Sequence, residues 1–148
     1  DARDAAREDI MAMAAGADSA VAEAMPDAAP AVVARGRFVD ADAVHKGSGD
    51  AILYRLADGS HVVRFEDFRA TNGPDLAVYL ARHPAPGSAA DVTDDGFVNL
   101  GKLKGNVGNQ NYTVPAGTQI DDYGSVVIWC ELFGVLFSPA ALTRETAG

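Results

Sequence analysis

The residue best suited to redox chemistry in this chain of 148 amino acids is Cys130, its one cysteine. A thiolate is a strong nucleophile and metal ligand, whereas a thiol buried among apolar groups is inert. A redox thiol therefore needs partial exposure and a lowered pKa. Because the sequence offers no second cysteine to resolve an oxidised form, a reactive Cys130 would pass through a sulfenic acid, a mixed disulfide or a metal bond.

The segment around Cys130 predicts a buried strand. Within residues 125–133, one face under the two-residue period of a strand is formed by Val126, Ile128, Cys130 and Leu132, and both faces are mainly apolar. A short run that is apolar on both faces is typical of a central strand. Taken alone, this pattern makes Cys130 a small core side chain, and the redox role stays an alternative. Trp129, Tyr112 and Tyr123 are candidates for shaping a site around the thiol.

A second candidate site is the loop that holds His45 together with Asp40, Asp42 and Asp50. Hard cations such as Ca²⁺ prefer carboxylate ligands, so these four residues are weak candidates for a metal site. Their spacing is not that of a calcium-binding loop, and we predict no metal or cofactor firmly. No histidine has a nucleophile and an orienting group beside it in the sequence. We therefore expect an accessory domain rather than a stand-alone enzyme.

A different function class is a non-catalytic module of the cell surface, structural or binding a ligand, a metal or a protein, with Cys130 in its core. In this interpretation the loops carry the function, because a rigid scaffold commonly presents binding residues on its loops. The candidate residues have amide, carboxylate or aromatic side chains: Asn72, Asp75, Asn109, Gln110, Tyr112 and Trp129.

The charge of the chain restricts its partners. Twenty-one acidic residues against twelve basic ones give a formal net charge of −9. Such a charge repels phosphate, so we expect no nucleic-acid partner. No apolar run reaches the roughly 18 residues of a membrane helix. The sequence starts at Asp1 without a recognisable signal segment, so we expect a processed or cut chain that meets a membrane only through an anchor outside this sequence.

From residue 35 onward, short β-type runs alternate with turn residues. The predicted strands are residues 36–39, 51–56, 61–65, 76–80, 97–103, 111–114, 125–133 and 135–138. Residues 82–96 are rich in proline, glycine and aspartate and are predicted to form a long exposed loop. Seven to eight short strands without alternating helices predict an all-β, β-sandwich-like domain over residues 35–148.

Residues 1–34 have a different character, with abundant alanine and all three methionines. An apolar stripe at spacings of three and four predicts an N-terminal alanine-rich helix: Ala6, Ile10, Met13, Ala17, Val21 and Ala24. Burial of alanine contributes little free energy, so such a helix needs a support. Two roles stay open: a stalk leading to an anchor, or a helix that packs on the domain or on a second subunit and allows self-association.

Four ordered blocks of the sequence resemble the DM-thirteen domain family, also called the electron-transfer DM-thirteen domain. The blocks are residues 36–51, 63–80, 98–115 and 125–137, followed by Ala140 and Leu142. They include the runs Asn72-Gly73-Pro74-Asp75 and Ile128-Trp129-Cys130. The resemblance covers about residues 36–142 and leaves out the leader before Ala34.

This resemblance implies a β-sandwich-like fold and an extracytoplasmic setting, whether periplasmic, secreted or membrane-tethered. It also implies redox or electron-transfer activity centred on a single cysteine near the C-terminal end, a position that Cys130 matches. The same resemblance implies that the domain has a protein or redox partner. Our leading hypothesis is an extracytoplasmic redox or electron-transfer accessory domain that uses Cys130.

Overall fold

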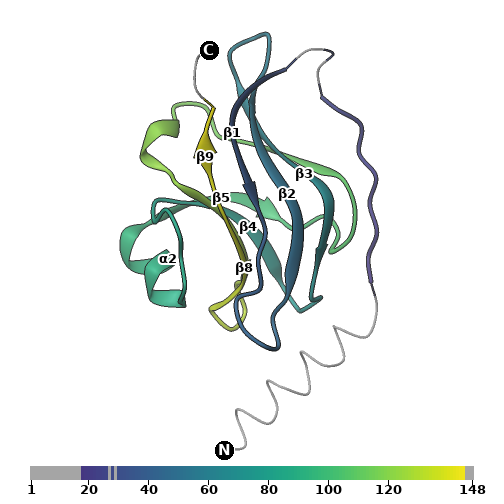
Figure 1. Ribbon diagram of the computed structural model, residues 1–148, viewed down its shortest axis with the longest axis vertical. Coiled ribbons are helices and arrows are strands. Elements are labelled where there is room, and N and C mark those ends of the chain that lie inside the picture. Colours follow the sequence, from purple (N-terminus) through teal and green to yellow (C-terminus); the bar gives the residue numbers. More distant parts are fainter. Residues whose placement is uncertain (1–17, 27, 29, 146–148) are drawn as a thin grey trace, which may run out of the picture.

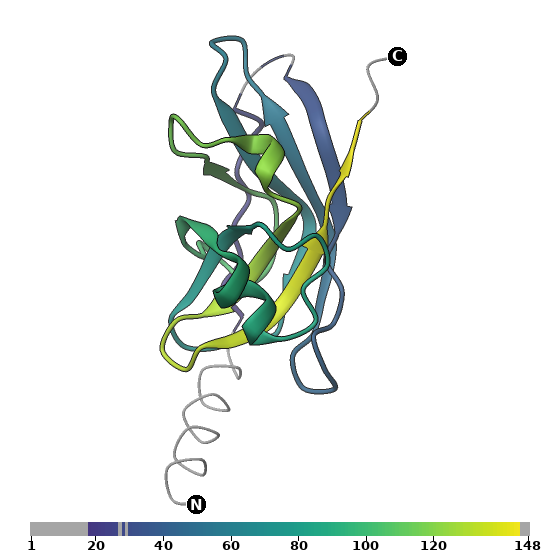
Figure 2. The same ribbon diagram turned by 90° about the vertical axis from the view of Figure 1, so that its left-hand side faces the viewer.

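The computed structural model describes residues 18–26, 28 and 30–145. Two antiparallel sheets pack face to face, as Figures 1 and 2 show from two sides. One sheet has the order β6-β3-β2-β1-β9 and the other the order β5-β4-β7-β8. The strands are β1 Ala31–Arg37, β2 Gly47–Arg55, β3 His61–Ala70, β4 Leu76–Ala81, β5 Phe97–Lys102, β6 Gln110–Thr113, β7 Ser125–Cys130, β8 Val135–Ala141 and β9 Thr143–Arg144. The predicted all-β, β-sandwich-like fold is confirmed.

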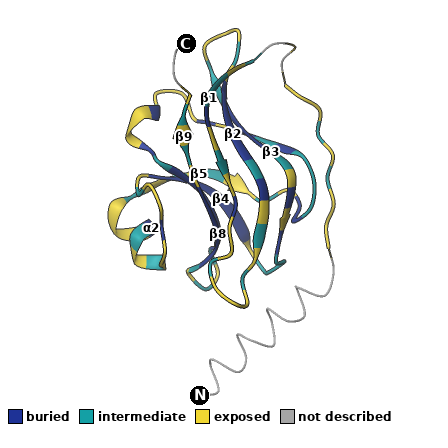
Figure 3. Ribbon diagram, viewed as in Figure 1, coloured by how far each residue is buried: buried dark blue, intermediate teal, exposed yellow. Residues whose placement is uncertain are grey.

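The two inner strands of the smaller sheet, β4 and β7, are buried at every residue. Figure 3 shows such buried residues concentrated between the sheets. We predicted that the β7 strand would continue to residue 133, but it ends at Cys130. The chain reverses there in a tight turn, in which Gly134 has a φ of +63° and donates its N–H to the Cys130 carbonyl oxygen at 2.8 Å. Leu132 consequently points outward and is 56% exposed.

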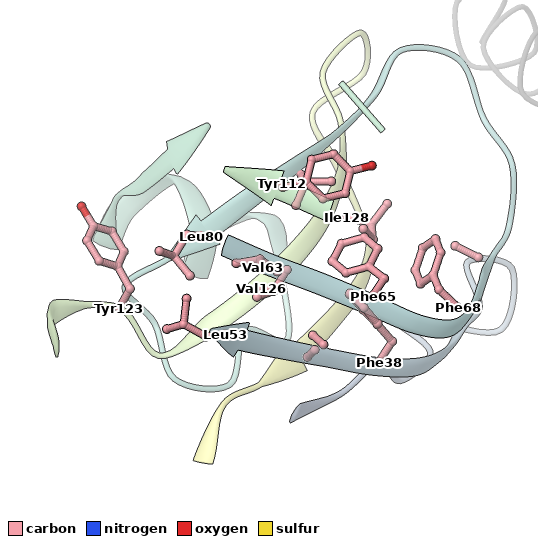
Figure 4. Close-up of a cluster of buried hydrophobic side chains, with 14 of the residues drawn as sticks. Phe38, Leu53, Val63, Phe65, Phe68, Leu80, Tyr112, Tyr123, Val126 and Ile128 are labelled. Atoms are coloured by element: carbon pink, nitrogen blue, oxygen red, sulfur yellow. The ribbon is translucent and has the colours of Figure 1, made fainter. Parts of the chain in front are cut away.

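The main core lies between the two sheets (Figure 4). Phe38, Phe65 and Phe68 form an aromatic cluster with ring centroids 4.7 to 5.0 Å apart. Burial of one such side chain contributes about 1.5–3 kcal/mol to folding. Val126 and Ile128 of β7 extend this core on the side of the smaller sheet. The alternation predicted for β7 is confirmed, because these residues face the core while Val127 and Trp129 face the other way.

The outer face of the smaller sheet is partly covered by a short helix, α2 Ala89–Asp95. Our prediction of a continuous loop over residues 82–96 is wrong at this helix. Ser88 caps it by accepting a hydrogen bond from the Asp91 N–H through its side chain. Val92 is the buried residue of the helix and packs among Tyr79, Trp129 and their neighbours. With one buried residue in seven, α2 shows too little apolar periodicity to be predicted from sequence.

The N-terminal segment that the structure describes is extended rather than helical. Most of the predicted helix falls in residues 1–17, which lie outside the described residues, but residues 18–24 were expected to continue it. Instead, Val21 and Glu23 donate their backbone N–H groups to the carbonyl oxygens of Val107 and Asn109. These contacts with the domain replace the hydrogen bonds that a helix would make within itself. Figure 1 shows the segment in purple, beside the sandwich.

The strand count and the first strand differ slightly from the prediction. Among the described residues there are nine strands, since the two-residue β9 is too short to give a sequence pattern. Strand β1 begins at Ala31, ahead of the boundary that we placed at residue 35. In the described part of the chain, no helix has the length and apolar composition to span a membrane.

Candidate functional site

Cys130 ends β7 with its side chain in the core between the sheets. It pairs with Leu76 of β4 and with Val135 of β8. None of its surface is exposed, at 0%. The sulfur atom Sγ donates a hydrogen bond to the Pro74 carbonyl oxygen at 3.1 Å. The thiol is therefore a core group at the end of a central strand, and the loop that precedes β4 covers it on this side.

We call residues 72–75 of this loop the thiol cover. Gly73 packs against the core so closely that a Cβ atom there would lie 2.7 Å from two ring carbons of Phe137. Asp75 adopts a left-handed φ of 59°, which aspartate tolerates better than most residues. Its carbonyl oxygen accepts a hydrogen bond from the Glu131 N–H at 3.0 Å. The thiol cover is thus held by packing on one side and by the turn after Cys130 on the other.

Lys102, at the end of β5, ties the thiol cover to that turn through its side chain. Its Nζ lies 2.5 Å from Asp75 Oδ1 and 2.5 Å from Glu131 Oε1. These two carboxylates raise the pKa of Lys102, and hydrogen bonds from Lys102 and Tyr79 lower the pKa of Glu131. The Lys102 side chain is 62% exposed, so water and salt screen both ion pairs. The connection is well defined in geometry but contributes little free energy.

A stack of aromatic rings lies beside this ionic group. Tyr79 is parallel to Phe97, with centroids 4.1 Å apart, and stacks more loosely on Trp129 at 5.9 Å. The Tyr79 hydroxyl donates a hydrogen bond to Glu131 Oε2 at 2.7 Å. Burial, and then the nearby Glu131 carboxylate, raise the pKa of Tyr79 above its ordinary value of 10.0. Tyr79 therefore stays protonated at neutral pH and acts as a hydrogen-bond donor.

An open pocket of about 250 Å³ lies on the outer side of the thiol cover. Its lining includes Asn72, Gly73 and Asp75 of the cover, Leu76 of β4 and Lys102 of β5. A movement of the thiol cover would open the interior toward this pocket. Lys102 in its wall is paired with Asp75 and Glu131, so these three side chains together carry a net negative charge.

The four candidate metal residues are not gathered around one point. His45 Nδ1 lies 2.8 Å from Asp42 Oδ2, and this contact lowers the pKa of Asp42 to about 2. Asp40 accepts a hydrogen bond from the Gly47 N–H and lies 3.5 Å from the Lys46 ammonium, while Asp50 faces a different cation, an arginine of β1. Within the described residues, no group of three or more histidine, cysteine or acidic side chains is placed to hold a metal ion.

Three of the candidate binding residues lie at or next to β6 and make contacts within the domain. Gln110 is fully buried, and its amide nitrogen donates to the carbonyl oxygens of Gly105 and Gly108. The Tyr112 hydroxyl bonds to Gln110 Oε1 and accepts the Lys104 N–H at 2.8 Å, and burial raises the pKa of Tyr112. Asn109 accepts the backbone N–H of Asp67 at 2.9 Å. These groups shape the turn between β5 and β6.

The structure brings Cys130 together with Asp75 but places Trp129 on the opposite face of the strand. Sequence reasoning missed Tyr79, Lys102 and Glu131. They come from different strands and turns, so their proximity depends on the register of β5, β4 and β7. The one available signal was Glu131 itself, a carboxylate within an otherwise apolar run.

In the comparison with protein families, residues 37–142 match the family described as Electron transfer DM13. The comparison with curated proteins found no match. Neither did the comparison with solved structures. The matched residues begin near the end of β1, reach the end of β8 and include the thiol cover, Lys102 and Cys130. Since the match covers most of the chain and agrees with the blocks that carried the resemblance, the chain belongs to the DM13, or DM-thirteen, family.

Proposed function

We propose that this chain is an extracytoplasmic electron-transfer accessory domain in which Cys130 is the redox-active group. The observation that carries the proposal is the place of the sulfur atom, at the end of a central strand and hydrogen-bonded to the thiol cover. The description of the family as one of electron transfer supports the chemical class. The extracytoplasmic setting follows from the same family resemblance.

Reaction begins when the thiol cover moves and the hydrogen bond from Cys130 to Pro74 breaks. The exposed thiol loses its proton to a water molecule or a buffer base. The thiolate then attacks one sulfur of a disulfide in a partner protein. A bond forms between Cys130 and that sulfur, the disulfide of the partner breaks, and its second sulfur leaves as a thiolate.

A partner is required because the sequence contains one cysteine and cannot close a disulfide within the chain. The oxidised form of Cys130 is consequently a mixed disulfide with another molecule. The partner reaches the sulfur through the pocket outside the thiol cover, which Lys102 and Asp75 line. The acidic charge of the chain favours a protein over a nucleic acid in this role.

The test measures how fast Cys130 of the native protein reacts with a small maleimide and with a soluble disulfide. Replacement Lys102→Met removes both ion pairs that hold the thiol cover, so we expect labelling on the order of three to ten times faster than in the wild type. Lys46→Met is the matched control, because Lys46 is equally exposed at 62% and pairs with Asp40. The control should label at the wild-type rate.

Mass spectrometry of the soluble-disulfide reaction should show one mixed disulfide per chain at Cys130. Global unfolding rates, measured on the same samples, separate a local movement of the cover from unfolding of the whole domain. If the wild type and Lys102→Met both label only at their global unfolding rates, the redox proposal fails.

Complete burial of Cys130 favours a second candidate function, a structural or binding module in which the cysteine is a core side chain. In this case Cys130→Ala and Cys130→Ser change only stability, and thiol reagents react only with the unfolded chain. The labelling experiment decides between the two functions, because local opening without unfolding belongs to the first alone.

A further inference from the structure

The extended segment at residues 18–24, which we call the arm, lies along the turn before β6 in the manner of a docked peptide. Val21 donates its N–H to the Val107 carbonyl oxygen at 2.9 Å, and the Val107 N–H donates to the Ser19 carbonyl oxygen at 3.3 Å. The Glu23 N–H continues the pattern to the carbonyl oxygen of Asn109, also at 2.9 Å. These bonds build a parallel pairing around Ala20 and Val107. The arm thus adds a short strand to an irregular edge of the domain.

Two carboxylates five positions apart anchor the arm. Glu23 Oε1 lies 2.6 Å from Lys104 Nζ and accepts the Asn111 N–H at 3.1 Å. Arg64 donates to the Glu23 carbonyl oxygen at 3.1 Å. The hydrogen bonds that Lys104 and Asn111 donate lower the pKa of Glu23, with Lys104 the larger cause. A negative charge at this position of the arm is therefore recognised by groups that belong to the domain.

Asp18 anchors the other end of the arm. Its carboxylate accepts hydrogen bonds from the Asn106 side chain at 3.0 Å and from Arg69 at 2.9 Å. Asn106 in turn is buried and bonds to the Ala70 carbonyl oxygen, so its amide is held in place by the domain. The domain therefore presents a fixed amide and an arginine to one carboxylate, and a lysine and a backbone N–H to the other.

Glycines let the arm come close to the domain. A Cβ atom on Gly105 would lie 2.5 Å from the Ser19 carbonyl oxygen, and one on Gly108 would lie 1.9 Å from that of Val21. Gly108 also has a φ of +109°, which other residues rarely adopt. Along the arm, Val21 and Glu23 are partly buried while Ala20, Ala22 and Ala24 are exposed. This alternation is typical of a strand that presents one face to its receptor.

The arm lies outside the family match, which begins at residue 37, while the groups that receive it lie inside. We propose that residues 104–111, with Arg64 and Arg69, form a binding site for an extended peptide that carries two carboxylates five positions apart. The chain's own arm is the ligand that occupies this site. A second copy of this chain carries an arm of the same sequence. When the resident arm leaves the site, the arm of that second copy is therefore the partner that fits it.

The experiment places a recognition sequence for a site-specific protease after residue 26 of the full chain and cuts the folded protein. The probe is a fluorescent synthetic peptide of residues 18–25, followed by anisotropy. We expect saturable binding to the cut protein, and binding at least about tenfold weaker to the uncut protein, whose tethered arm competes at high effective concentration. Circular dichroism of the cut protein should keep the β spectrum of the uncut one.

Variants locate the contact. A peptide with Glu23→Gln, or cut protein with Lys104→Met, should bind roughly three to ten times more weakly, because each removes the same ion pair. A peptide with Ala22→Gln should bind as well as the unchanged peptide, since Ala22 is exposed. The proposal is overturned if the folded cut protein does not bind the peptide, if both charge variants bind unchanged, or if release of the arm unfolds the domain.

Discussion

Both faces of β7 are buried, but its inner face differs sharply from the polar contacts that begin at the end of the strand. On the inner face, Val126, Ile128 and Cys130 lie in the core between the sheets, and each is fully buried. On the outer face, Trp129 packs against Tyr79, and just after the end of the strand Glu131 reaches an exposed lysine. The strand therefore holds the sulfur in the core, immediately before the chain enters the turn that carries Glu131.

This contrast separates two energy scales. Packing on the inner face contributes several kcal/mol per side chain, because large buried groups leave cavities when removed. Each ionic or hydrogen-bonding contact of the outer face contributes about 1 kcal/mol or less. A thiol at the boundary can be shielded by the strong contacts and exposed by breaking the weak ones. Measurements on both faces test whether this division holds.

The largest effect is expected on the inner face. Ile128→Ala removes a fully buried side chain from the core, so the free energy of unfolding should fall by about 2–5 kcal/mol. Leu132→Ala, two residues after the strand, removes a side chain that is 56% exposed. This change should alter the free energy of unfolding by less than about 0.5 kcal/mol. Urea denaturation followed by circular dichroism measures both. Equal losses would show that the turn is as tightly packed as the strand.

Cys130 itself should give an intermediate effect. Cys130→Ser places a more polar hydroxyl among apolar neighbours, with the Pro74 carbonyl as acceptor, and should cost about 1–3 kcal/mol. Cys130→Ala leaves a small cavity without a polar group and should cost less than the serine variant. Urea denaturation of the two variants provides the comparison. If the serine variant were as stable as the wild type, the side chain at position 130 would have to be more exposed to water than the structure shows.

The inner face of β7 could be predicted from sequence because it depends on one local rule. Alternation placed Val126, Ile128 and Cys130 together, and the structure confirms this. It also placed Leu132 with them, which is wrong because the strand ends before it and Leu132 is exposed. The end of the strand could not be predicted in this way. The run stays apolar to Phe133, but the reversal at Gly134 depends on how β7 pairs with β8.

The ionic group at the end of β7 was beyond sequence reasoning for a different reason. Lys102 meets Asp75 and Glu131 only because β5 and β7 both pair with β4 in the observed register. The arm illustrates the same limit, since a pattern suited to a helix is overridden at Val21 and Glu23 by hydrogen bonds to a distant turn. Local periodicity predicts which residues are buried, whereas contacts between charged groups depend on pairing across the whole sheet.

A smaller effect is expected from the hydrogen bond between Tyr79 and Glu131. Tyr79→Phe keeps the stack with Phe97 and Trp129 but removes the hydroxyl, so unfolding should require about 0.5–1.5 kcal/mol less free energy. Glu131→Gln still offers an acceptor oxygen to Tyr79 and serves as the comparison. Thermal denaturation at pH 7 measures both variants. A loss above about 3 kcal/mol for Tyr79→Phe would mean that the hydrogen bond to Glu131 is not one of the weak contacts.

The smallest effect is the pH dependence of Glu131. Its pKa in the folded protein is lowered from the ordinary value of 4.5, first by Lys102 and then by Tyr79. A carboxylate with a lowered folded pKa stabilises the native state above its unfolded pKa, and this contribution is lost as the pH falls through the folded value. The free energy of unfolding of the wild type should therefore exceed that of Glu131→Gln by less than about 1 kcal/mol at pH 7. This difference should shrink as the pH falls below 4.5 and vanish once the pH is below the folded pKa of Glu131. Denaturant titrations of both proteins from pH 7 downward measure this difference. If it persists at the acid end, packing rather than charge holds Glu131 against the thiol cover, and the weak contacts of the outer face are not what release the thiol.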